Sequence, residues 1–387
     1  MIFSDWTQEL LVLETKLVSL LQPRSYYIEN FLHSVSVVSD PNNAIFYVYP
    51  CIAALCTPRS SLPFELMLIG SLLSWSSIHV KWAFRGDRPF WWVKEVIQSY
   101  PNLPALRQTH NTCVANPGNP SSHVMVHAGV LLVLVNSMLS TWRNSSAKNS
   151  KFTLHPWYSW MWKWGCWGFY TALILIVMLS RIYNSTHFPH QCIFGAIFGG
   201  YLATKIHANW NSEWREKQKS WKVCVFTLMP VIIAIGTYWI QKAFDIDPQR
   251  SVRLAFKWCF SPYDISVNTT PVYYLTCSCG CLFGLGVVLL LQRQAVAFFF
   301  RGLKSSKEPY FHSLFANNSW LFYLTNGVGV LLSACLLFKL QSQIPTDSVT
   351  IFYLHHFALN FAAPFLYFAF VPIMLKLMTK KIKIKED

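Results

Sequence analysis

Three short segments, 81–89, 120–123 and 180–191, place cations and histidines close together in a chain that is otherwise poor in charge. A phosphate monoester is a dianion, so a pocket that binds it needs fixed positive charge and many hydrogen-bond donors. Lys81 supplies a compact charge, while Arg88 and Arg181 can each present a planar fork to two phosphate oxygens. These residue types predict a phosphate-binding pocket.

The middle segment, Pro120-Ser121-Ser122-His123, comes directly before a long apolar run and is expected to begin a helix. Backbone N–H groups at a helix N-terminus point outward and favour negative charge. We therefore expect Ser121 and Ser122 to bind the phosphate oxygens that the cations leave uncontacted.

Two histidines in these segments suggest how a phosphate ester would be cleaved. The sequence shows no ligand set at metal spacing, so we expect no metal and no other cofactor, and hydrolysis would pass through a covalent intermediate. A neutral imidazole can attack phosphorus, and a second imidazole can protonate the departing alcohol. His187 and His123 fit these two roles, but composition and spacing alone do not decide which residue is which.

The composition indicates the kind of protein that must position these residues. Of 387 residues, 53% are hydrophobic and 13% charged, and the mean hydropathy is +0.31, which is too apolar for an ordinary soluble domain. The net charge of +15 comes from short basic segments between apolar runs, so no nucleic-acid partner is expected. The sequence predicts an all-α, multi-pass membrane protein forming a single domain, 1–387.

Runs of about twenty apolar residues, the length that crosses a bilayer, mark nine expected spans. They are 43–63, 65–84, 124–142, 159–181, 188–206, 222–241, 271–292, 319–341 and 350–375. An odd number of spans puts the two termini on opposite sides of the membrane.

The basic residues set the expected orientation, because cytosolic loops carry an excess of Lys and Arg. One side collects the cations that follow the first, third, fifth, seventh and ninth spans, including the tail 376–387. That side is predicted to be cytosolic, so the N-terminal segment 1–42 and the three motif segments would be lumenal. Residues 6–21 could lie along the membrane interface. Lys383 and Lys385 resemble a dilysine retrieval signal, although a basic tail is also typical of a cytosolic flank.

The predicted lumenal loops also contain glycosylation sequons and cysteines. Asn111 and Asn268 are the expected glycan acceptors, and Asn184 is expected to be too close to the membrane for modification. A disulfide between Cys113 and Cys259 is compatible with the lumen, but the sequence does not assign it.

The motifs Lys-x6-Arg-Pro, Pro-Ser-x-His and Ser-Arg-x5-His resemble the signature of the phosphatidic acid phosphatase and haloperoxidase superfamily. Longer matches make the chain similar to the glucose-6-phosphatase catalytic subunits, over about residues 25–385. These matches are 88–93, 117–123, 180–183, 187–191, 258–259, 269–271 and 282–286.

The resemblance implies a role for each motif residue. His187 would carry the phosphoryl group, His123 would act as general acid and then as base, and Lys81, Arg88 and Arg181 would bind phosphate. The implied enzyme is a phosphoric monoester hydrolase that converts glucose 6-phosphate to glucose at the lumenal face of the endoplasmic reticulum, in gluconeogenesis and glycogenolysis. Membrane lipid would surround it, and a glucose 6-phosphate transporter would be a functional partner.

Two positions depart from the superfamily pattern. Ser122 replaces a glycine, which would strain the turn and reduce activity if this position requires a positive φ angle. Gln191 replaces an aspartate beyond the nucleophile, and its carbonyl can still accept from the imidazole. Ser180 and Gln191 are expected to support the site. The glutamine matches the glucose-6-phosphatase subfamily.

Two other functions remain open at this point. The chain could be a lipid phosphate phosphatase of the same superfamily, or a catalytically impaired homologue that binds anions. Trp91, Trp92, Tyr183 and Phe188 could line a wall against a sugar ring or an acyl chain. Asp87 and Gln108 are candidate partners for sugar hydroxyls, with His110 at the rim.

Overall fold

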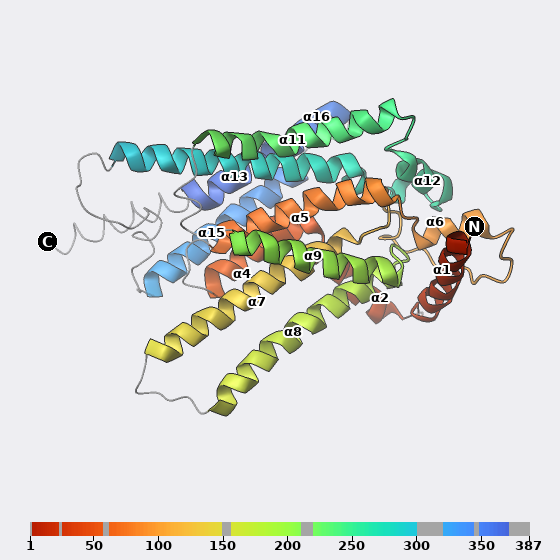
Figure 1. Ribbon diagram of the computed structural model, residues 1–387, viewed down its shortest axis with the longest axis horizontal. Helices are drawn as coiled ribbons and strands as arrows, with labels where there is room; N and C mark the ends of the chain where they lie inside the picture. Colours follow the sequence, from red (N-terminus) through yellow and green to blue (C-terminus); the bar gives the residue numbers. More distant parts are fainter. Residues whose placement is uncertain are drawn as a thin grey trace.

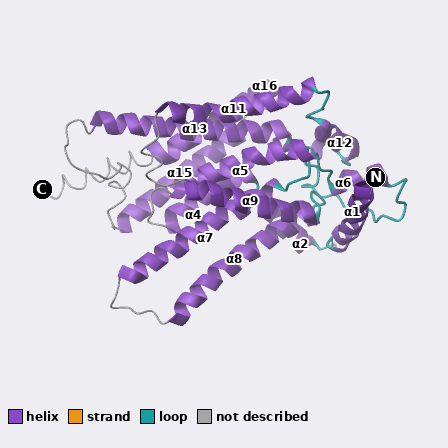
Figure 2. Cartoon of the chain, viewed as in Figure 1, coloured by secondary structure: helices purple, strands orange, loops and turns teal. Residues whose placement is uncertain are grey.

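The fold is a bundle of long helices, as seen in a computed structural model (Figure 1). The structure describes residues 2–22, 25–56, 62–148, 156–209, 220–299, 320–343 and 348–370. Figure 2 shows helices joined by loops, and no strand occurs in these residues. The predicted all-α class is therefore confirmed.

The first half of the chain forms helices that carry the motif segments or precede them. They are α1 (Ile2–Leu20), α2 (Tyr26–Val38), α3 (Pro41–Asn43), the π-helical segment η1 (Ala44–Val48), α4 (Tyr49–Cys56), α5 (Leu62–Phe84), α6 (Pro89–Val96), α7 (Ser122–Lys148), α8 (Pro156–Tyr183) and α9 (Pro189–Asn209).

The second half packs against this group. It comprises α11 (Ser220–Ala243), α12 (Arg250–Trp258), the short turns η2 (Pro262–Asp264) and η3 (Val267–Thr269), α13 (Pro271–Phe299), α15 (Trp320–Ser342), α16 (Val349–Phe365) and η4 (Leu366–Phe370). The basic tail 376–387, with Lys383 and Lys385, lies outside the described residues.

Each of the nine expected spans contains helix, but the count of nine crossings is not confirmed. Within the described ranges, five helices are long and apolar enough to cross a membrane: those at 122–143, 157–183, 221–243, 271–291 and 349–368. Helix α5 carries Glu65 and Lys81, and helix α4 has only eight residues. The structure thus supports a multi-pass membrane protein, and the number of its spans stays a prediction.

Helix α5 lies at the centre of the bundle, with most of its side chains buried. It packs against α7 on one side and α13 on another, and α9 covers α7. The α7–α9 crossing is close because α9 has glycines at the contact. A Cβ atom on Gly199 would lie 2.1 Å from the backbone oxygen of Met125, and one on Gly195 would lie 2.8 Å from that of Ser121. Small residues of this kind allow two membrane helices to approach closely.

The three motif segments meet at one end of the bundle, which we call the site end. Here α1 runs across the ends of the long helices, beside α6 and α12 (Figure 1). Proline at the first helical position lets α6 begin directly after Arg88, whose backbone is still extended. The motif residues therefore lie in loops and first turns, held by helices on either side.

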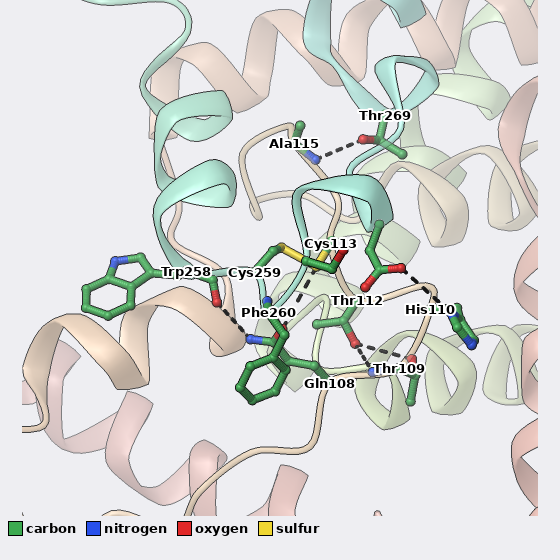
Figure 3. The surroundings of a disulfide bond; sticks show 12 residues. Gln108, Thr109, His110, Thr112, Cys113, Ala115, Trp258, Cys259, Phe260 and Thr269 are labelled. Carbon is green, nitrogen blue, oxygen red and sulfur yellow. Dashed lines mark hydrogen bonds and ion pairs between the residues drawn. A yellow bond between two sulfur atoms is a disulfide. The ribbon is translucent and has the colours of Figure 1, made fainter.

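A disulfide between Cys113 and Cys259 joins the loop before α7 to the end of α12 (Figure 3). Next to it, the Gln108 side chain donates to the backbone oxygen of Trp258 (2.9 Å) and accepts from the backbone N–H of Phe260 (3.0 Å). The second half of the chain is thus attached to the loop that leads into the 120–123 motif.

Candidate active site

Arg88 connects two of the loops at the site end. Its side chain is 1% exposed, and its Nε and Nη2 donate to the backbone and side-chain oxygens of Asn116 (2.6 and 2.5 Å). Its Nη1 donates to the backbone oxygen of Thr186 (2.6 Å) and lies 3.2 Å from Nε2 of His187. Arg88 therefore places a positive charge directly beside an imidazole nitrogen.

The two ring nitrogens of His187 have different partners. Because Arg88 can only donate, its contact with Nε2 requires a lone pair on that nitrogen. Nδ1 lies 3.2 Å from Oε1 of Gln191, an acceptor, so Nδ1 carries the proton. His187 is thus a neutral imidazole whose Nε2 lone pair faces the cationic group.

Gln191 is itself fixed by two further hydrogen bonds. Its Nε2 donates to the backbone oxygen of Asp87 (2.8 Å), and its Oε1 accepts from the backbone N–H of Phe188 (3.2 Å). These contacts settle which end of the amide faces His187. The glutamine can therefore orient the ring as an aspartate would, without adding a negative charge.

Lys81 and Arg88 share an acceptor. Lys81 is fully buried near the end of α5, and its Nζ donates to the backbone oxygen of Pro117 (2.6 Å), which also accepts from Arg88 (3.2 Å). Among the described residues, the backbone oxygen of Pro117 is the acceptor that Nζ of Lys81 reaches. Two of the three N–H groups of Lys81 therefore remain for a bound anion.

Arg181 and Ser180 lie at the end of α8, against α2. Arg181 is 2% exposed and donates to the Ser36 hydroxyl, while its buried Nε has no partner among the described residues. The Ser180 hydroxyl donates to the backbone oxygen of Leu32 (2.8 Å). Ser180 therefore fixes α8 to α2, and Arg181 keeps a buried donor that a phosphate oxygen could satisfy.

The 120–123 segment begins α7, as expected. The Ser121 backbone N–H donates to the backbone oxygen of Gln191 (3.1 Å), and the Ser122 hydroxyl lies 3.0 Å from that of Ser77. Non-glycine residues with positive φ are Arg85, Ser185 and Asp245 among those described, so Ser122 does not have the strained backbone that its departure from glycine suggested. The serine fits this turn without backbone strain.

His123 lies in the first turn of α7 and is 7% exposed. Its Nε2 is 4.0 Å from Oδ2 of Asp40, the residue that precedes α3. Asp40 is held in place because its Oδ2 accepts from the Tyr274 hydroxyl (2.8 Å) and its Oδ1 accepts from the backbone N–H of Asn42 (3.0 Å). A carboxylate therefore faces the second histidine from outside the three motifs.

Burial and neighbouring cations determine the charge of His187. The pKa of His187 lies well below its ordinary value of 6.5, first because burial disfavours the imidazolium. Arg88, Lys81 and Arg181, and then His123, lower this pKa further. The electrostatic coupling of these five side chains indicates that the structure brings the motif residues together, with a neutral His187 among the cations.

The residues considered for sugar recognition have other contacts. Trp91, Trp92, Tyr183 and Phe188 are buried, at 0–3% exposure. Asp87 accepts from the Trp91 indole (3.1 Å) and from Arg250 (3.0 Å), and both polar atoms of Gln108 are bonded beside the disulfide. His110 is largely exposed and lies 3.7 Å from Asp264. In this arrangement these residues maintain the structure of the site end.

Sequence reasoning missed Asp40 and Asn116. Asp40 directly precedes Pro41 and a helix start, which is a recognisable N-capping pattern, but nothing local connects it to His123. Asn116 accepts from Arg88 and donates to the backbone oxygen of Thr269 (2.9 Å). Figure 3 shows the neighbouring contact, in which the Ala115 N–H donates to the Thr269 hydroxyl. Thr269 thus holds the loop that positions Arg88.

The fold and the grouped motif residues define the class of this protein as a membrane phosphatase. Residues 62–215 match the PAP2 superfamily, a range that begins at α5 and includes all three motifs. The protein is a phosphoric monoester hydrolase.

Whole-chain comparisons specify the family. The chain is 31% identical over 375 residues to glucose-6-phosphatase 2 of Homo sapiens, covering 92% of this chain and 93% of the relative. It is 32% identical over 256 residues to glucose-6-phosphatase catalytic subunit 1 of Canis lupus familiaris, covering 66% and 68%. The chain belongs to the glucose-6-phosphatase family, as its motifs suggested. No solved structure matches it.

Proposed function

We propose that this protein hydrolyses glucose 6-phosphate to glucose and phosphate through a phosphohistidine at His187. The observation that carries the proposal is the pair of contacts made by the His187 ring: Nδ1 lies 3.2 Å from Oε1 of Gln191, and Nε2 lies 3.2 Å from Nη1 of Arg88. The names of the relatives support the choice of sugar phosphate as substrate.

In the first step Nε2 of His187 attacks phosphorus, and the bond between phosphorus and the sugar oxygen breaks. The attack uses the Nε2 lone pair, so Nη1 of Arg88 loses its acceptor on the ring and becomes free to donate to a phosphate oxygen. Lys81 and the unpaired Nε of Arg181 supply further donors. These cations stabilise the charge that develops on the phosphoryl oxygens.

His123 donates a proton to the departing sugar oxygen and is left neutral. It then takes a proton from water, which attacks phosphorus and breaks the bond to Nε2, so phosphate leaves and both histidines return to their starting states. Oδ2 of Asp40 lies 4.0 Å from Nε2 of His123, so it can pair with the imidazolium that the first step requires.

We also propose that the site faces the lumen of the endoplasmic reticulum, with the N-terminus lumenal and the C-terminus cytosolic. Two features at the site end support this orientation: the Cys113–Cys259 disulfide fits an oxidising compartment, and the Asn268 sequon is exposed. Glucose 6-phosphate cannot cross a bilayer unaided, so a transporter would deliver it to a lumenal site.

The test is phosphate release from glucose 6-phosphate by the purified protein in lipid nanodiscs, with phosphatidate as the competing substrate. We expect turnover of the sugar phosphate, loss of turnover in His187→Ala, and a loss of about 10²–10⁴-fold in His123→Ala. Hydrolysis of phosphatidate without hydrolysis of glucose 6-phosphate would favour the lipid phosphatase alternative. Phosphate binding without any turnover would favour the impaired homologue.

A further inference from the structure

We propose that α1 is a membrane-surface helix whose inner face positions the loop that carries His187. The residues that make this connection are Glu14 and Gln22, which contact the two ends of segment 183–190. The proposal rests on the proposed function for its catalytic consequence, but its structural part can be tested without a substrate.

Glu14 contacts the end of the segment that leads into α9. Its side chain is 8% exposed, its Oε1 accepts from the backbone N–H of His190 (2.9 Å), and its Oε2 lies 2.6 Å from Nδ1 of the same residue. One carboxylate thus holds both the backbone and the ring of His190. His190 is three residues after His187 in the sequence. Its ring stacks on that of Phe188, the residue that directly follows His187.

Gln22, just after α1, contacts the other end of the segment. Its Nε2 donates to the backbone oxygen of Tyr183 (2.6 Å), to the Ser185 hydroxyl (2.9 Å) and to the backbone oxygen of Arg107 (3.0 Å). Its Oε1 accepts from the backbone N–H of Arg107 (3.1 Å). Gln22 therefore attaches the start of the segment to the N-terminal part of the chain.

The backbone of this segment requires support. Ser185 has a φ of 52°, a left-handed conformation that non-glycine residues adopt only when their surroundings maintain it. It is fully buried, and its hydroxyl is the group that Gln22 contacts. Loss of these contacts would let the segment relax and move Nε2 of His187 relative to Arg88.

An uncovered stripe of leucines runs along α1, next to the exposed Glu9 and Lys16. Leu10, Leu13, Leu17 and Leu20, spaced three or four residues apart, are 44%, 65%, 43% and 80% exposed. This spacing puts them on one helical stripe, with the buried Glu14 at its edge and the buried Thr15 and Val18 on the far side of the helix. In a multi-pass protein whose α1 crosses the end of the bundle (Figure 1), the occupant that fits this stripe is the interfacial layer of the bilayer.

Hydrogen–deuterium exchange in phosphatidylcholine nanodiscs tests the positioning role without substrate. Glu14→Ala should speed exchange in peptides covering 184–192 by about tenfold or more, because a charged hydrogen bond is lost. Glu14→Gln should be intermediate, since its amide oxygen can still accept from His190. Glu9→Ala, an exposed change on the same helix, is the matched control. Equal exchange in Glu14→Ala and wild type would overturn the proposal.

Turnover of glucose 6-phosphate tests the catalytic consequence. We expect Glu14→Ala to lower kcat about tenfold with KM within about twofold, because phosphate ligands are retained while the nucleophile is misplaced. Unchanged kcat in Glu14→Ala, alongside an inactive His187→Ala, would overturn the positioning role and leave the proposed function intact. An inactive wild type would instead refute the proposed function, and the exchange experiment would still decide the structural part.

A photoactivatable phosphatidylcholine in the same nanodiscs tests the membrane contact. We expect label on the α1 peptide, and less of it in the double variant Leu13→Ser/Leu20→Ser than in the control Lys16→Ser. If the leucines act through Glu14, a variant that combines Leu13→Ser, Leu20→Ser and Glu14→Ala should lose less kcat than the two separate losses together predict. Absence of lipid label, or a cross-link to a second copy at these leucines, would overturn the membrane contact.

Discussion

The Nδ1 atom of His187 lies 3.2 Å from Oε1 of Gln191, and this contact sets which ring nitrogen is available for attack. Without an acceptor at Nδ1 the ring can rotate or change tautomer, as happens when a catalytic histidine loses its orienting partner. We predict that Gln191→Leu lowers kcat about 10- to 100-fold, consistent with the cost of an unsatisfied buried donor. Steady-state kinetics should show this loss, and Gln191→Glu should retain more activity because it keeps an acceptor. Equal activity in Gln191→Leu and wild type would contradict the tautomer assignment.

The loss of rate in His123→Ala should be greater for a more basic leaving group. A sugar alkoxide needs protonation as it departs, whereas nitrophenolate does not. In His123→Ala we expect release of nitrophenol from p-nitrophenyl phosphate to show a rapid first turnover, followed by slow hydrolysis of the phosphoenzyme. Stopped-flow absorbance measures both phases. A first turnover that is slowed equally for both substrates would argue against His123 as the general acid.

The lowered pKa of His187 predicts how stability depends on pH. The unfolded chain binds a proton at this residue below a pH of about 6.5, but the folded protein resists protonation there, so its stability falls as the pH drops. A His187→Gln variant lacks this effect. Thermal unfolding between pH 7.5 and 5.5 should show a steeper loss in wild type, with a difference of at most about 1.4 kcal/mol per pH unit. Parallel profiles would show that His187 is not held neutral.

The glycines of α9 offer a matched pair that tests the α7–α9 crossing. A Cβ on Gly199 would overlap the Met125 backbone oxygen, whereas one on Gly200 would meet its nearest neighbour, Leu132, at 3.7 Å. We predict that Gly199→Ala costs about 1–3 kcal/mol, the usual effect of overpacking. Gly200→Ala should be close to neutral. Thermal unfolding in detergent compares them, and similar melting temperatures would mean that α7 and α9 are not closely packed.

Glycosylation tests the proposed orientation. Asn268 is exposed at the site end, while Asn184 is 2% exposed and donates to the Ser180 backbone oxygen. In microsomes, Asn268→Gln should remove a glycan and increase mobility on a gel, and Asn184→Gln should change nothing. An unglycosylated wild type whose site end is accessible from the cytosol would reverse the orientation.

The parts of the site that sequence predicts well are those in which local pattern and chemistry coincide. Arg88, His123 and His187 each adjoin a helix start, so their placement at one end of a bundle follows from where the apolar runs begin. Cation and imidazole chemistry then indicates a phosphate site. The helix found in the described part of each of the nine apolar runs follows in the same way.

Other parts depend on contacts between segments distant in sequence. Nothing near Glu14 indicates that it contacts His190, which lies 176 residues away. The strain expected at Ser122 assumed a backbone conformation that only the structure could decide, and φ there is not positive. The number of membrane spans stays a prediction, because α5 carries buried charged residues that serve the site and α4 is short as described.

The most direct test of the central claim is the chemical identity of the reaction intermediate. The protein in nanodiscs, mixed for milliseconds with glucose 6-phosphate and quenched in alkali to preserve phosphohistidine, can be digested and sequenced by mass spectrometry. We predict phosphate on His187, its accumulation in His123→Ala, and its absence in His187→Ala. Phosphate on any other residue, or an unchanged intermediate in His187→Ala, would contradict the mechanism.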